Sequence, residues 1–395
     1  MTQAAVHPPR ARAGAQGTVE ADVSHGFGGL ARLQAAWEAL FVSRQHEPCV
    51  SFEWTTAMVR HHVRPDDRCV LVHLRRDDTT VGLVPLIARP TKVMGARITI
   101  LSPLSEHYNT HSDLLLEAID DEVAQAFVGA LRNLGVSWDC FRMARLLEDD
   151  PLAGALRRAL EANGVLHSVR QGLPAYVLLL PASFDEYLGA RSAKFRNHLK
   201  RSTRKLHAAG DVRVHELTHT DAFEDAYDAL LLVERASWKE WHGTSITAID
   251  HQTAFYRDFT RAALATGRLH LHWLTIDARP VAYNLGYMTR AGYHYLKTSY
   301  DHAARALGPA AFLRAQLVKS LIGKGVSRLD FPGEPYEWET QWTESIQWRT
   351  VLSAYPRTIR GRALAAIDRL RHRDRGRRVE HVDPRASSGG PRVRS

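Results

Sequence analysis

Two short sequence patterns occur twice along the chain in the same order, and this repetition constrains the fold more than any other feature. The first pattern is a strand, an Asp in the turn after it, and a Val that begins the next strand. Its first copy is Arg68–His73 with Asp77 and Val81. Its second copy, 200 residues later, is Arg268–His272 with Asp277 and Val281. The second pattern is Gly-Val-Ser followed by Asp and Phe, with copies 190 residues apart: Gly135 to Phe141, then Gly325 to Phe331. Two matches in one order at similar offsets favour a duplicated domain over coincidence.

The length of the chain agrees with a duplication. Its 395 residues exceed what one hydrophobic core usually supports, so two domains are expected. Hydrophobic periodicity predicts helices and strands in alternation, which is an α/β architecture. We divide the chain into a disordered leader, two α/β units and a basic tail: residues 1–26, 27–172, 173–356 and 357–395.

The composition is that of an ordinary globular protein, with 45% hydrophobic and 24% charged residues. No apolar run approaches the ~20 residues that a bilayer crossing needs. The three cysteines, Cys49, Cys69 and Cys140, are too few and too widely spaced for a disulfide framework or a zinc site. We therefore expect a cytoplasmic protein with reduced thiols, either a monomer or a homodimer.

The net charge of +9 is concentrated at the C-terminal end. Residues 357–395 contain twelve Arg and four acidic residues, which leaves the rest of the chain close to neutral. A helix expected at 358–370 has a thin apolar stripe, so we expect it to pack against the body of the protein. The alternative for this tail is peripheral contact with an anionic membrane or with nucleic acid.

The second unit contains a predicted binding loop for an anion. Strands are predicted at 269–276, 281–288 and 292–298, and a helix begins at Pro309 directly after Gly308. A helix N-terminus offers unpaired N–H groups and the positive end of the helix dipole. Glycine lets an anion approach the backbone, and proline suits the first helical turn. A strand at 326–331 and a last strand at 346–354 follow.

In this order of elements the second unit resembles the GNAT superfamily of acyltransferases, specifically the CelD/BcsL-like branch, which is related to FemAB-type transferases. The residues that carry the resemblance are Ser192–Lys205, Ser237–Lys239, Leu296–Asp301, Gly308-Pro309, Leu329–Tyr336 and Trp342. The resemblance covers residues 176–355, and the first unit is similar to the family's degenerate upstream domain. It implies tandem GNAT-like domains, each a mixed, mostly antiparallel sheet flanked by helices.

The resemblance also implies an acyl-CoA donor, acetyl-CoA or another, with its pyrophosphate on the amides around Arg305–Ala310. The implied donor-binding residues are Lys297, Thr298, Arg305, Leu307, Gly308, Pro309 and Ala310. The implied acceptor is an amine or hydroxyl of an envelope- or polysaccharide-related molecule. Two alternatives remain: a FemAB-like transferase that uses aminoacyl-tRNA, and a non-catalytic binding module of polysaccharide biosynthesis.

Acyl transfer to an amine needs two proton movements: the ammonium loses a proton and the leaving thiolate gains one. Carboxylates beside the strand ends suit the first role and a tyrosine suits the second. We therefore predict Asp330 as base or substrate anchor, with Glu334 beside it, and Tyr336 as acid.

Further polar residues are candidates for binding the acceptor. Residues 191–205 have seven Lys or Arg and no acid, and Arg196 and Lys200 lie on one helical face. This face either attracts an anionic substrate, tRNA included, or is simply solvated. The other candidates are Tyr300, Asp301 and two residues of the polar loop 105–113, His107 and Asn109. The spacing of His107 and His111 would suit a metal, but no H-E-x-x-H pattern accompanies it, and we expect no metal.

Overall fold

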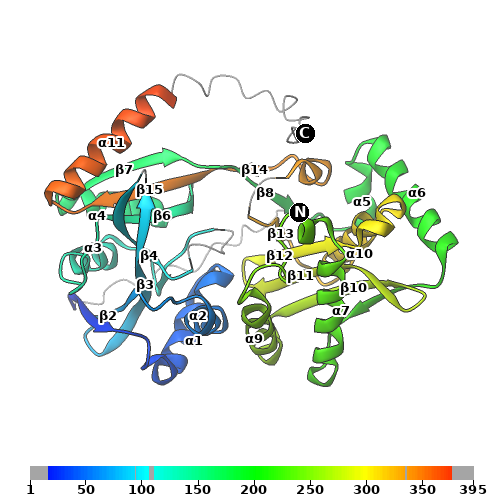
Figure 1. Ribbon diagram of the computed structural model, residues 1–395, viewed down its shortest axis with the longest axis horizontal. Coiled ribbons are helices and arrows are strands. Elements are labelled where there is room, and N and C mark those ends of the chain that lie inside the picture. Colours follow the sequence, from blue (N-terminus) through cyan, green and yellow to red (C-terminus); the bar gives the residue numbers. More distant parts are fainter. Residues whose placement is uncertain (1–16, 94, 106–110, 334–335, 376–395) are drawn as a thin grey trace, which may run out of the picture.

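Two mixed sheets organise the chain, one in each of two lobes that lie side by side (Figure 1). The computed structural model describes residues 17–93, 95–105, 111–333 and 336–375. The first sheet has the strand order β1-β2-β3-β4-β6-β15-β7, with β5 paired to β3. Its strands are β1 (Val19–His25), β2 (Arg68–Arg76), β3 (Thr79–Val93), β4 (Ala96–Pro103), β5 (Leu115–Leu116), β6 (Cys140–Leu147), β7 (Leu166–Gln171) and β15 (Arg349–Tyr355).

The second sheet has the order β14-β8-β13-β12-β11-β10-β9. Its strands are β8 (Ala175–Leu179), β9 (Val212–Glu216), β10 (Leu269–Ile276), β11 (Arg279–Thr289), β12 (Gly292–Tyr300), β13 (Arg328–Asp330) and β14 (Ile346–Gln347). Three hairpin-connected strands, a helix and a further strand follow one another here as the sequence predicts, and this last strand pairs with β12 in parallel.

Helices flank both sheets. The first lobe has α1 (Gln34–Ser43), α2 (Phe52–His61), α3 (Asp121–Ala130), α4 (Pro151–Ala162) and the 3₁₀ turns η1 (Leu30–Leu33) and η2 (Pro48–Val50). The second lobe has α5 (Phe184–Gly189), α6 (Ala193–Ala209), α7 (Phe223–Arg235), α8 (Trp238–Trp241), α9 (Gln252–Ala265), α10 (Pro309–Gly323) and the 3₁₀ turns η3 (Thr220–Ala222), η4 (His302–Leu307) and η5 (Glu337–Gln341). The helix expected at 184–208 is broken in two because the Ser192 hydroxyl accepts from the Phe195 N–H and starts α6 there.

The two sheets repeat one topology, which confirms the predicted duplication of a mixed, mostly antiparallel sheet flanked by helices. Each contains one parallel pair, β4 with β6 and β12 with β13. Every other pairing between described strands is antiparallel. In the first lobe α3 lies between the two parallel strands along the chain, and in the second lobe α10 does. The helices α3 and α10 are therefore equivalent positions of the two copies.

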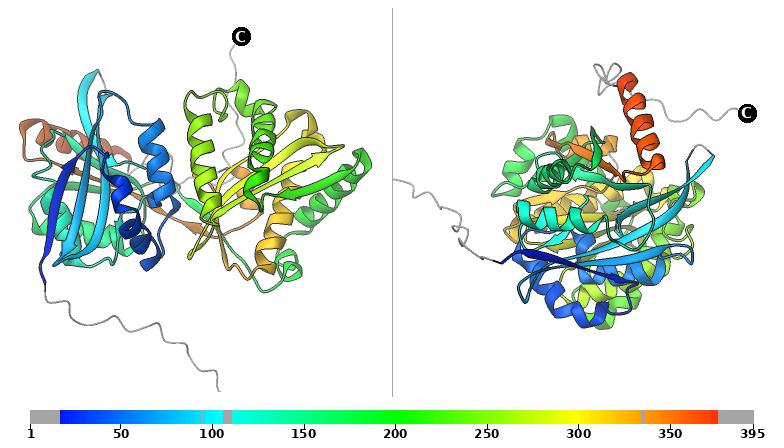
Figure 2. Two further views of the ribbon diagram at one scale, coloured as in Figure 1. Left: turned by 90° about the horizontal axis from the view of Figure 1, so that it is seen from below. Right: turned by 90° about the vertical axis from the view of Figure 1, so that its left-hand side faces the viewer.

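The last predicted strand does not stay in the second lobe. Residues 346–347 pair with β8 as β14, but β15 crosses to the first lobe and inserts between β6 and β7 (Figure 2). All seven residues of β15 are buried, and Leu352 and Ala354 enter the core of the first lobe. The expected boundary at residue 356 is therefore wrong for this strand, whose apolar side chains complete the first sheet.

Two terminal segments also differ from the sequence expectation. Residues 19–25, assigned to the leader, form β1, because Val19, Ala21 and Val23 alternate toward the core of the first lobe. The helix α11 (Ile359–Arg375) packs on β7 and β15, with Ala365 buried beside Tyr355. Among the described residues, no helix combines the length and apolar character that a membrane crossing needs.

One hydrophobic core joins the lobes. It contains buried side chains of α1 and α2 from the first lobe together with side chains of α7, α9 and β11 from the second. Trp54 of α2 makes edge contacts with Phe255 and Phe259 of α9, with ring centroids 5.3 and 4.9 Å apart. Beside it, Arg268 of the second lobe lies 2.7 Å from Glu38 and 3.0 Å from Glu53 of the first.

Replacing Arg268 with Met should destabilise the whole protein. The Glu53 side chain is only 4% exposed, so its carboxylate would lose its ion partner inside the core. Breaking a buried pair costs about 3 kcal/mol or more of the free energy of unfolding, measured by chemical denaturation. Arg213→Met is the control, because the Arg213–Asp211 pair is exposed and its loss should cost less than about 0.5 kcal/mol. Equal small effects of both substitutions would contradict a shared core.

Candidate active site

A cavity of about 970 Å³ opens where the parallel strands β12 and β13 separate. The two strands pair only at Tyr293 with Leu329 and at His294 with Asp330. Beyond this point the cavity wall is formed by Leu296–Tyr300 on one side and by Pro332 and Gly333 on the other. The register of β12 against β11 shifts by one residue at Leu296, and such a bulge bends a strand and redirects its side chains. The size is within the usual range of ligand pockets, about 300–1,000 Å³.

The N-terminus of α10 faces this cavity through Gly308, Pro309, Ala310 and Ala311. Gly308 has φ 74°, a left-handed conformation that suits glycine, and a Cβ there would collide with the Ser202 hydroxyl. No side chain among the described residues caps this helix end, and its first turn contains no acid. The unpaired N–H groups are therefore available to an anion.

The equivalent helix of the first lobe has the opposite character. The Asp120 carboxylate accepts a hydrogen bond from the Val123 N–H at the start of α3, and Asp121 and Glu122 follow in the first turn. Arg76 neutralises part of this charge from β2. A capped and acidic helix end repels a phosphate, so only the second copy offers an anion site at this position.

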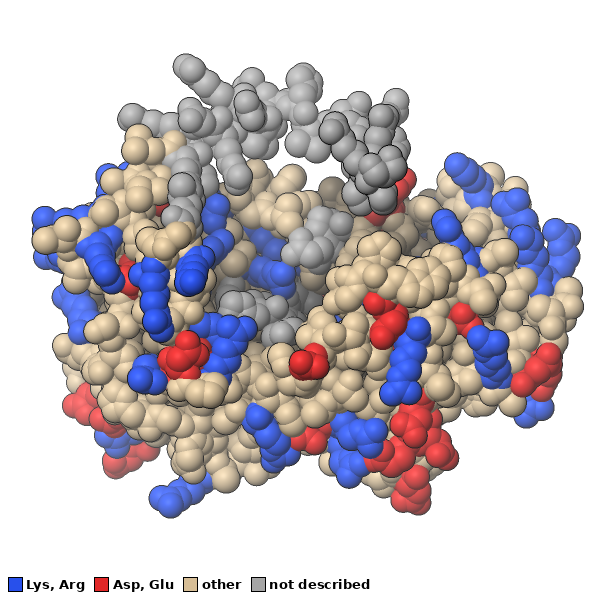
Figure 3. Space-filling model, in the orientation of Figure 1, with Lys and Arg blue, Asp and Glu red and all other residues tan. Residues whose placement is uncertain are grey.

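Basic side chains surround the α10 end of the cavity. Lys194, His198 and Arg201 line it from α6, and Arg305 lines it from η4. Burial and the neighbouring cations Arg201 and Lys205 lower the pKa of His198. Figure 3 shows further Lys and Arg side chains gathered on the outer edge of this lobe, over α6. The cavity is therefore suited to a polyanionic ligand.

Two lysines line the other end of the cavity. Lys239 donates to the Thr298 carbonyl and its Nζ lies 3.8 Å from Glu234 Oε1. Lys297 lies over the Tyr256 ring, 5.4 Å from its centroid. Burial, and next the charge of Lys239, lower the pKa of Lys297 from 10.5 to about 8. Lowered lysine pKa values in a cavity are typical of functional sites.

The third wall is aromatic and rigid. The Arg314 guanidinium stacks 3.7 Å from the centroid of the Trp338 ring and 5.1 Å from that of Trp342. The Tyr336 ring stacks on the Trp338 ring, and the two ring centroids are 6.4 Å apart. Burial raises the pKa of Glu339 to about 8, and this side chain accepts from the Tyr336 N–H. These contacts hold Tyr336 at the cavity wall.

The first lobe also reaches the cavity, through Trp54 and Arg145. Tyr256, which lies beside Lys297, and Trp238 of the second lobe add two more aromatic rings to the cavity wall. Both lobes therefore form one site.

The structure brings together eight of the predicted site residues on the cavity wall: Lys297, Thr298, Tyr300, Arg305, Gly308, Pro309, Ala310 and Tyr336. Leu307 packs instead into a small core with Phe312 and Leu313. Asp301 is buried, where it caps η4 and pairs with Arg279 at 2.6 Å. Glu334, His107 and Asn109 lie outside the described residues.

Asp330 does not line the cavity. Its carboxylate accepts from Arg328 at 2.6 and 3.0 Å and lies 3.6 Å from His294 Nδ1. Glu47 of the first lobe lies 3.5 Å from the same histidine nitrogen, and burial raises its pKa well above the ordinary value. Asp330 therefore belongs to a buried ionic cluster between the lobes, and the predicted contact with the reacting atoms does not agree with this position.

The predicted face of the basic helix is also not the one that lines the cavity. Arg196 donates to the carbonyls of Leu188 and Gly189 at the end of α5, and Lys200 points to solvent. The spacing of Lys194, His198 and Arg201 could have indicated the correct face, because these residues follow one another every three or four positions. Arg314 also carried a signal, since it is a single cation in an otherwise apolar stretch of helix. Nothing in the sequence indicated that Trp54 and Arg145 would line the cavity.

The comparisons with known proteins agree with this geometry. Residues 193–340 match the family model of the acetyltransferase (GNAT) domain. The fold of most of the chain is similar to that of FemX, with a TM-score of 0.55 at 10% identity, over 84% of this chain and 96% of FemX. The fold is also similar to that of a conserved protein of unknown function from Bacteroides thetaiotaomicron. The TM-score is 0.53 at 11% identity, over 85% of this chain and 100% of that one.

A third structure is the C-terminal domain of a protein described as a lysylphosphatidylglycerol synthetase, from Agrobacterium fabrum. It gives a TM-score of 0.52 at 12% identity, over 86% of this chain and 96% of that one. No curated protein matches the chain in sequence. The parallel strand pair and the glycine-started helix both lie within residues 193–340, the part of the chain that matches the family model of the acetyltransferase (GNAT) domain.

Proposed function

We propose that the second lobe transfers an acyl group from acyl-CoA, with acetyl-CoA as the simplest donor, to an amine or hydroxyl. The observation that carries this proposal is the uncapped N-terminus of α10, which opens at Gly308 into a cavity lined by Lys194, Arg201 and Arg305. A pyrophosphate fits these N–H groups and cations. The acyl end of the donor then extends along β12 toward Lys297.

The chemistry requires a nucleophile that has lost a proton and a thiolate that gains one. The acceptor nitrogen or oxygen attacks the thioester carbon, and the C–S bond breaks. Tyr336, on the cavity wall beside Gly333, gives its proton to the leaving thiolate. Glu344 also lines the cavity and can take the proton that the acceptor loses. Asp330 acts as a positioning residue, because it holds Arg328 and His294 where β12 and β13 separate.

The lysine end of the cavity suits an acceptor with a negatively charged group. Lys239 and Lys297 offer two ammonium groups, and Trp238, next to Lys239 in the chain, offers an apolar ring surface. This combination agrees with a sugar- or lipid-linked acceptor of envelope or polysaccharide metabolism. The cationic outer face of α6 favours one second candidate, a FemAB-like transferase that takes its acyl group from aminoacyl-tRNA.

Binding of CoA at α10 should stabilise the protein against unfolding. At a CoA concentration of about a hundred times the dissociation constant, the free energy of unfolding should rise by ~2.7 kcal/mol. Gly308→Ala should abolish this increment, because its Cβ would collide with Ser202 in the loop that receives the pyrophosphate. Gly323→Ala, at the other end of α10 with open space around it, is the matched control and should keep the increment.

This titration and a transfer assay with charged tRNA together distinguish four outcomes. A CoA-dependent shift lost only in Gly308→Ala supports the acyl-CoA donor. No shift with CoA, acetyl-CoA or a longer acyl-CoA in a folded sample contradicts it. Acyl transfer that depends on charged tRNA identifies the FemAB-like alternative, and an inert protein that retains neither donor identifies a binding module.

Replacing Tyr336 with Phe should slow the chemical step without weakening donor binding. Loss of a general acid typically lowers kcat by about 10²-fold or more, while the dissociation constant of CoA should stay the same. The assay is release of the free thiol from acetyl-CoA in the presence of an amino sugar. Tyr176→Phe is the control, because Tyr176 lies in β8 outside the cavity lining. A Tyr336→Phe variant with unchanged kcat would remove this residue from the mechanism.

The buried ammonium of Lys297 should reduce stability in a pH-dependent way. Its pKa is about 8 in the folded protein and 10.5 ordinarily, so between these values the unfolded chain binds more protons. The contribution of Lys297 to the free energy of unfolding therefore becomes more favourable as the pH rises from 8 to 10.5. At pH 7, Lys297→Met should be more stable than the wild type by about 1–2 kcal/mol, since Lys297 stays partly exposed to the cavity.

This difference in unfolding free energy should shrink as the pH rises toward 10.5. Lys319→Met, exposed on α10, should show no such pH-dependent difference. A stability difference between wild type and Lys297→Met that does not change between pH 7 and pH 10 would contradict the lowered lysine pKa.

A further inference from the structure

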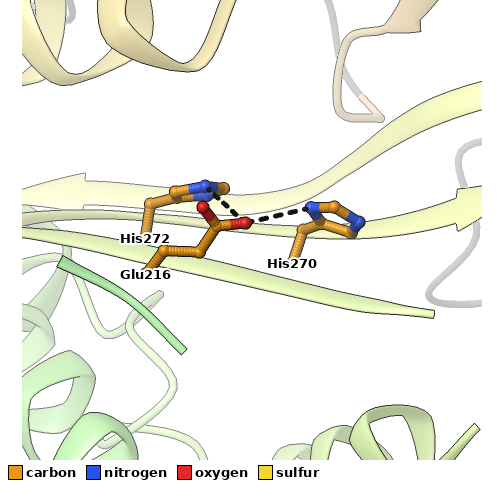
Figure 4. A group of neighbouring side chains, drawn as sticks. All are labelled: Glu216, His270 and His272. Carbon is orange, nitrogen blue, oxygen red and sulfur yellow. Dashed lines mark ion pairs between the residues drawn. The ribbon is translucent and has the colours of Figure 1, made fainter. Parts of the chain in front are cut away.

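Three potential metal ligands converge on the face of the second sheet that α10 covers, away from the cavity. Glu216 ends the edge strand β9, and its register partner in β10 is His272. His270 lies two residues before His272 in β10, so both histidines are on the same face of the sheet. Glu216 Oε1 lies 3.5 Å from His272 Nε2 and 3.9 Å from His270 Nδ1 (Figure 4). One ligand atom from each of the three side chains lies within 4.8 Å of the other two.

The two imidazoles lack the hydrogen bonds that buried polar groups normally make. The His272 side chain is 6% exposed, and neither of its ring nitrogens has a hydrogen-bond partner among the described residues. The same holds for His270 Nδ1. Most buried polar atoms in folded proteins make hydrogen bonds, so three nitrogens without one at the same place require an explanation.

A bound divalent metal would account for the two nitrogens that face Glu216, His272 Nε2 and His270 Nδ1. In a tetrahedral zinc site with bonds of about 2.0–2.1 Å, neighbouring ligand atoms are about 3.3 Å apart. The separations of 3.5 and 3.9 Å need only small side-chain movements to reach this value. Two histidines and one carboxylate are a common zinc ligand set that leaves the fourth position for water.

We propose that Glu216, His270 and His272 bind a zinc ion. The Glu216 side chain is 35% exposed, which leaves the ion a path from solvent. The bound ion would fasten the edge strand β9 to β10, and edge strands are the part of a sheet most in need of such protection. It would lie at the C-terminal end of α10, about 22 Å along the helix from the donor site, and would not take part in acyl transfer.

Lys324 substitutes for the ion in the structure. Its Nζ donates to the same Glu216 Oε1 at 2.8 Å, and its side chain is 44% exposed. Zinc and this ammonium compete for one oxygen, so the lysine has to turn into solvent when the ion binds. Replacing Lys324 with Met should therefore strengthen zinc binding, whereas replacing a ligand should weaken it.

The test is titration of the full chain, free of any histidine tag and of bound metal, with zinc chloride against a chromophoric chelator. The wild type should bind one zinc ion at this site. His272→Asn and His270→Asn should each weaken binding by about 100-fold or more, since even loss of an outer-shell partner costs ~10–100-fold. Lys324→Met should strengthen it by about tenfold, the effect of one nearby charge. His215→Asn is the control, because His215 lies on the opposite face of β9, stacked on Trp273.

Cobalt(II) titration gives a second readout, because tetrahedral nitrogen and oxygen ligands produce intense visible absorption bands. These bands should form in the wild type and in Lys324→Met and be absent from His272→Asn. Absence of zinc binding in the wild type overturns the proposal. Zinc affinity that is the same in wild type, His272→Asn and Lys324→Met also overturns it. Should His272→Asn fail to fold, the Lys324→Met affinity and the cobalt spectrum still decide the question.

Discussion

The shared hydrophobic core between the lobes is the constraint on which the remaining structure depends. Trp54 and its neighbours on α2 are buried only because α9 of the second lobe covers them, and β15 completes the first sheet only by leaving the second lobe. Neither lobe can therefore bury its apolar surface alone. The same packing places Trp54 and Arg145 of the first lobe in the wall of the cavity. The duplicated architecture thus creates one site from two copies.

The two copies differ at the helix that follows the central hairpin strands. In the first copy Asp120, Asp121 and Glu122 cap and surround the start of α3 with negative charge. In the second copy Gly308 leaves the N–H groups of α10 free toward the cavity. The sheets and their parallel strand pairs are retained in both. A few side chains at one helix end are therefore enough to explain why the proposed anionic donor would have one binding site and not two.

Much of this could be predicted from the sequence. The repeated patterns indicated the duplication, and Gly308-Pro309 indicated the helix start, because both depend on local backbone preferences. The crossing of β15 from the second lobe into the first sheet could not be predicted, since its apolar residues would fit either sheet. Asp330 was misplaced for a related reason: the strand end was correct, but tertiary packing brings its partner His294 and the carboxylate of Glu47 to it. The histidines of β10 and Glu216 meet only through the register of β9, which the sequence does not specify.

The central claim is that the N-terminus of α10 receives the pyrophosphate of an acyl-CoA. A crystal structure of the protein with acetyl-CoA tests it most directly. The account predicts phosphate oxygens within about 3 Å of the backbone N–H groups that follow Gly308, with the thioester beside β12. A CoA bound elsewhere on the molecule, with the start of α10 filled by a side chain, would contradict it.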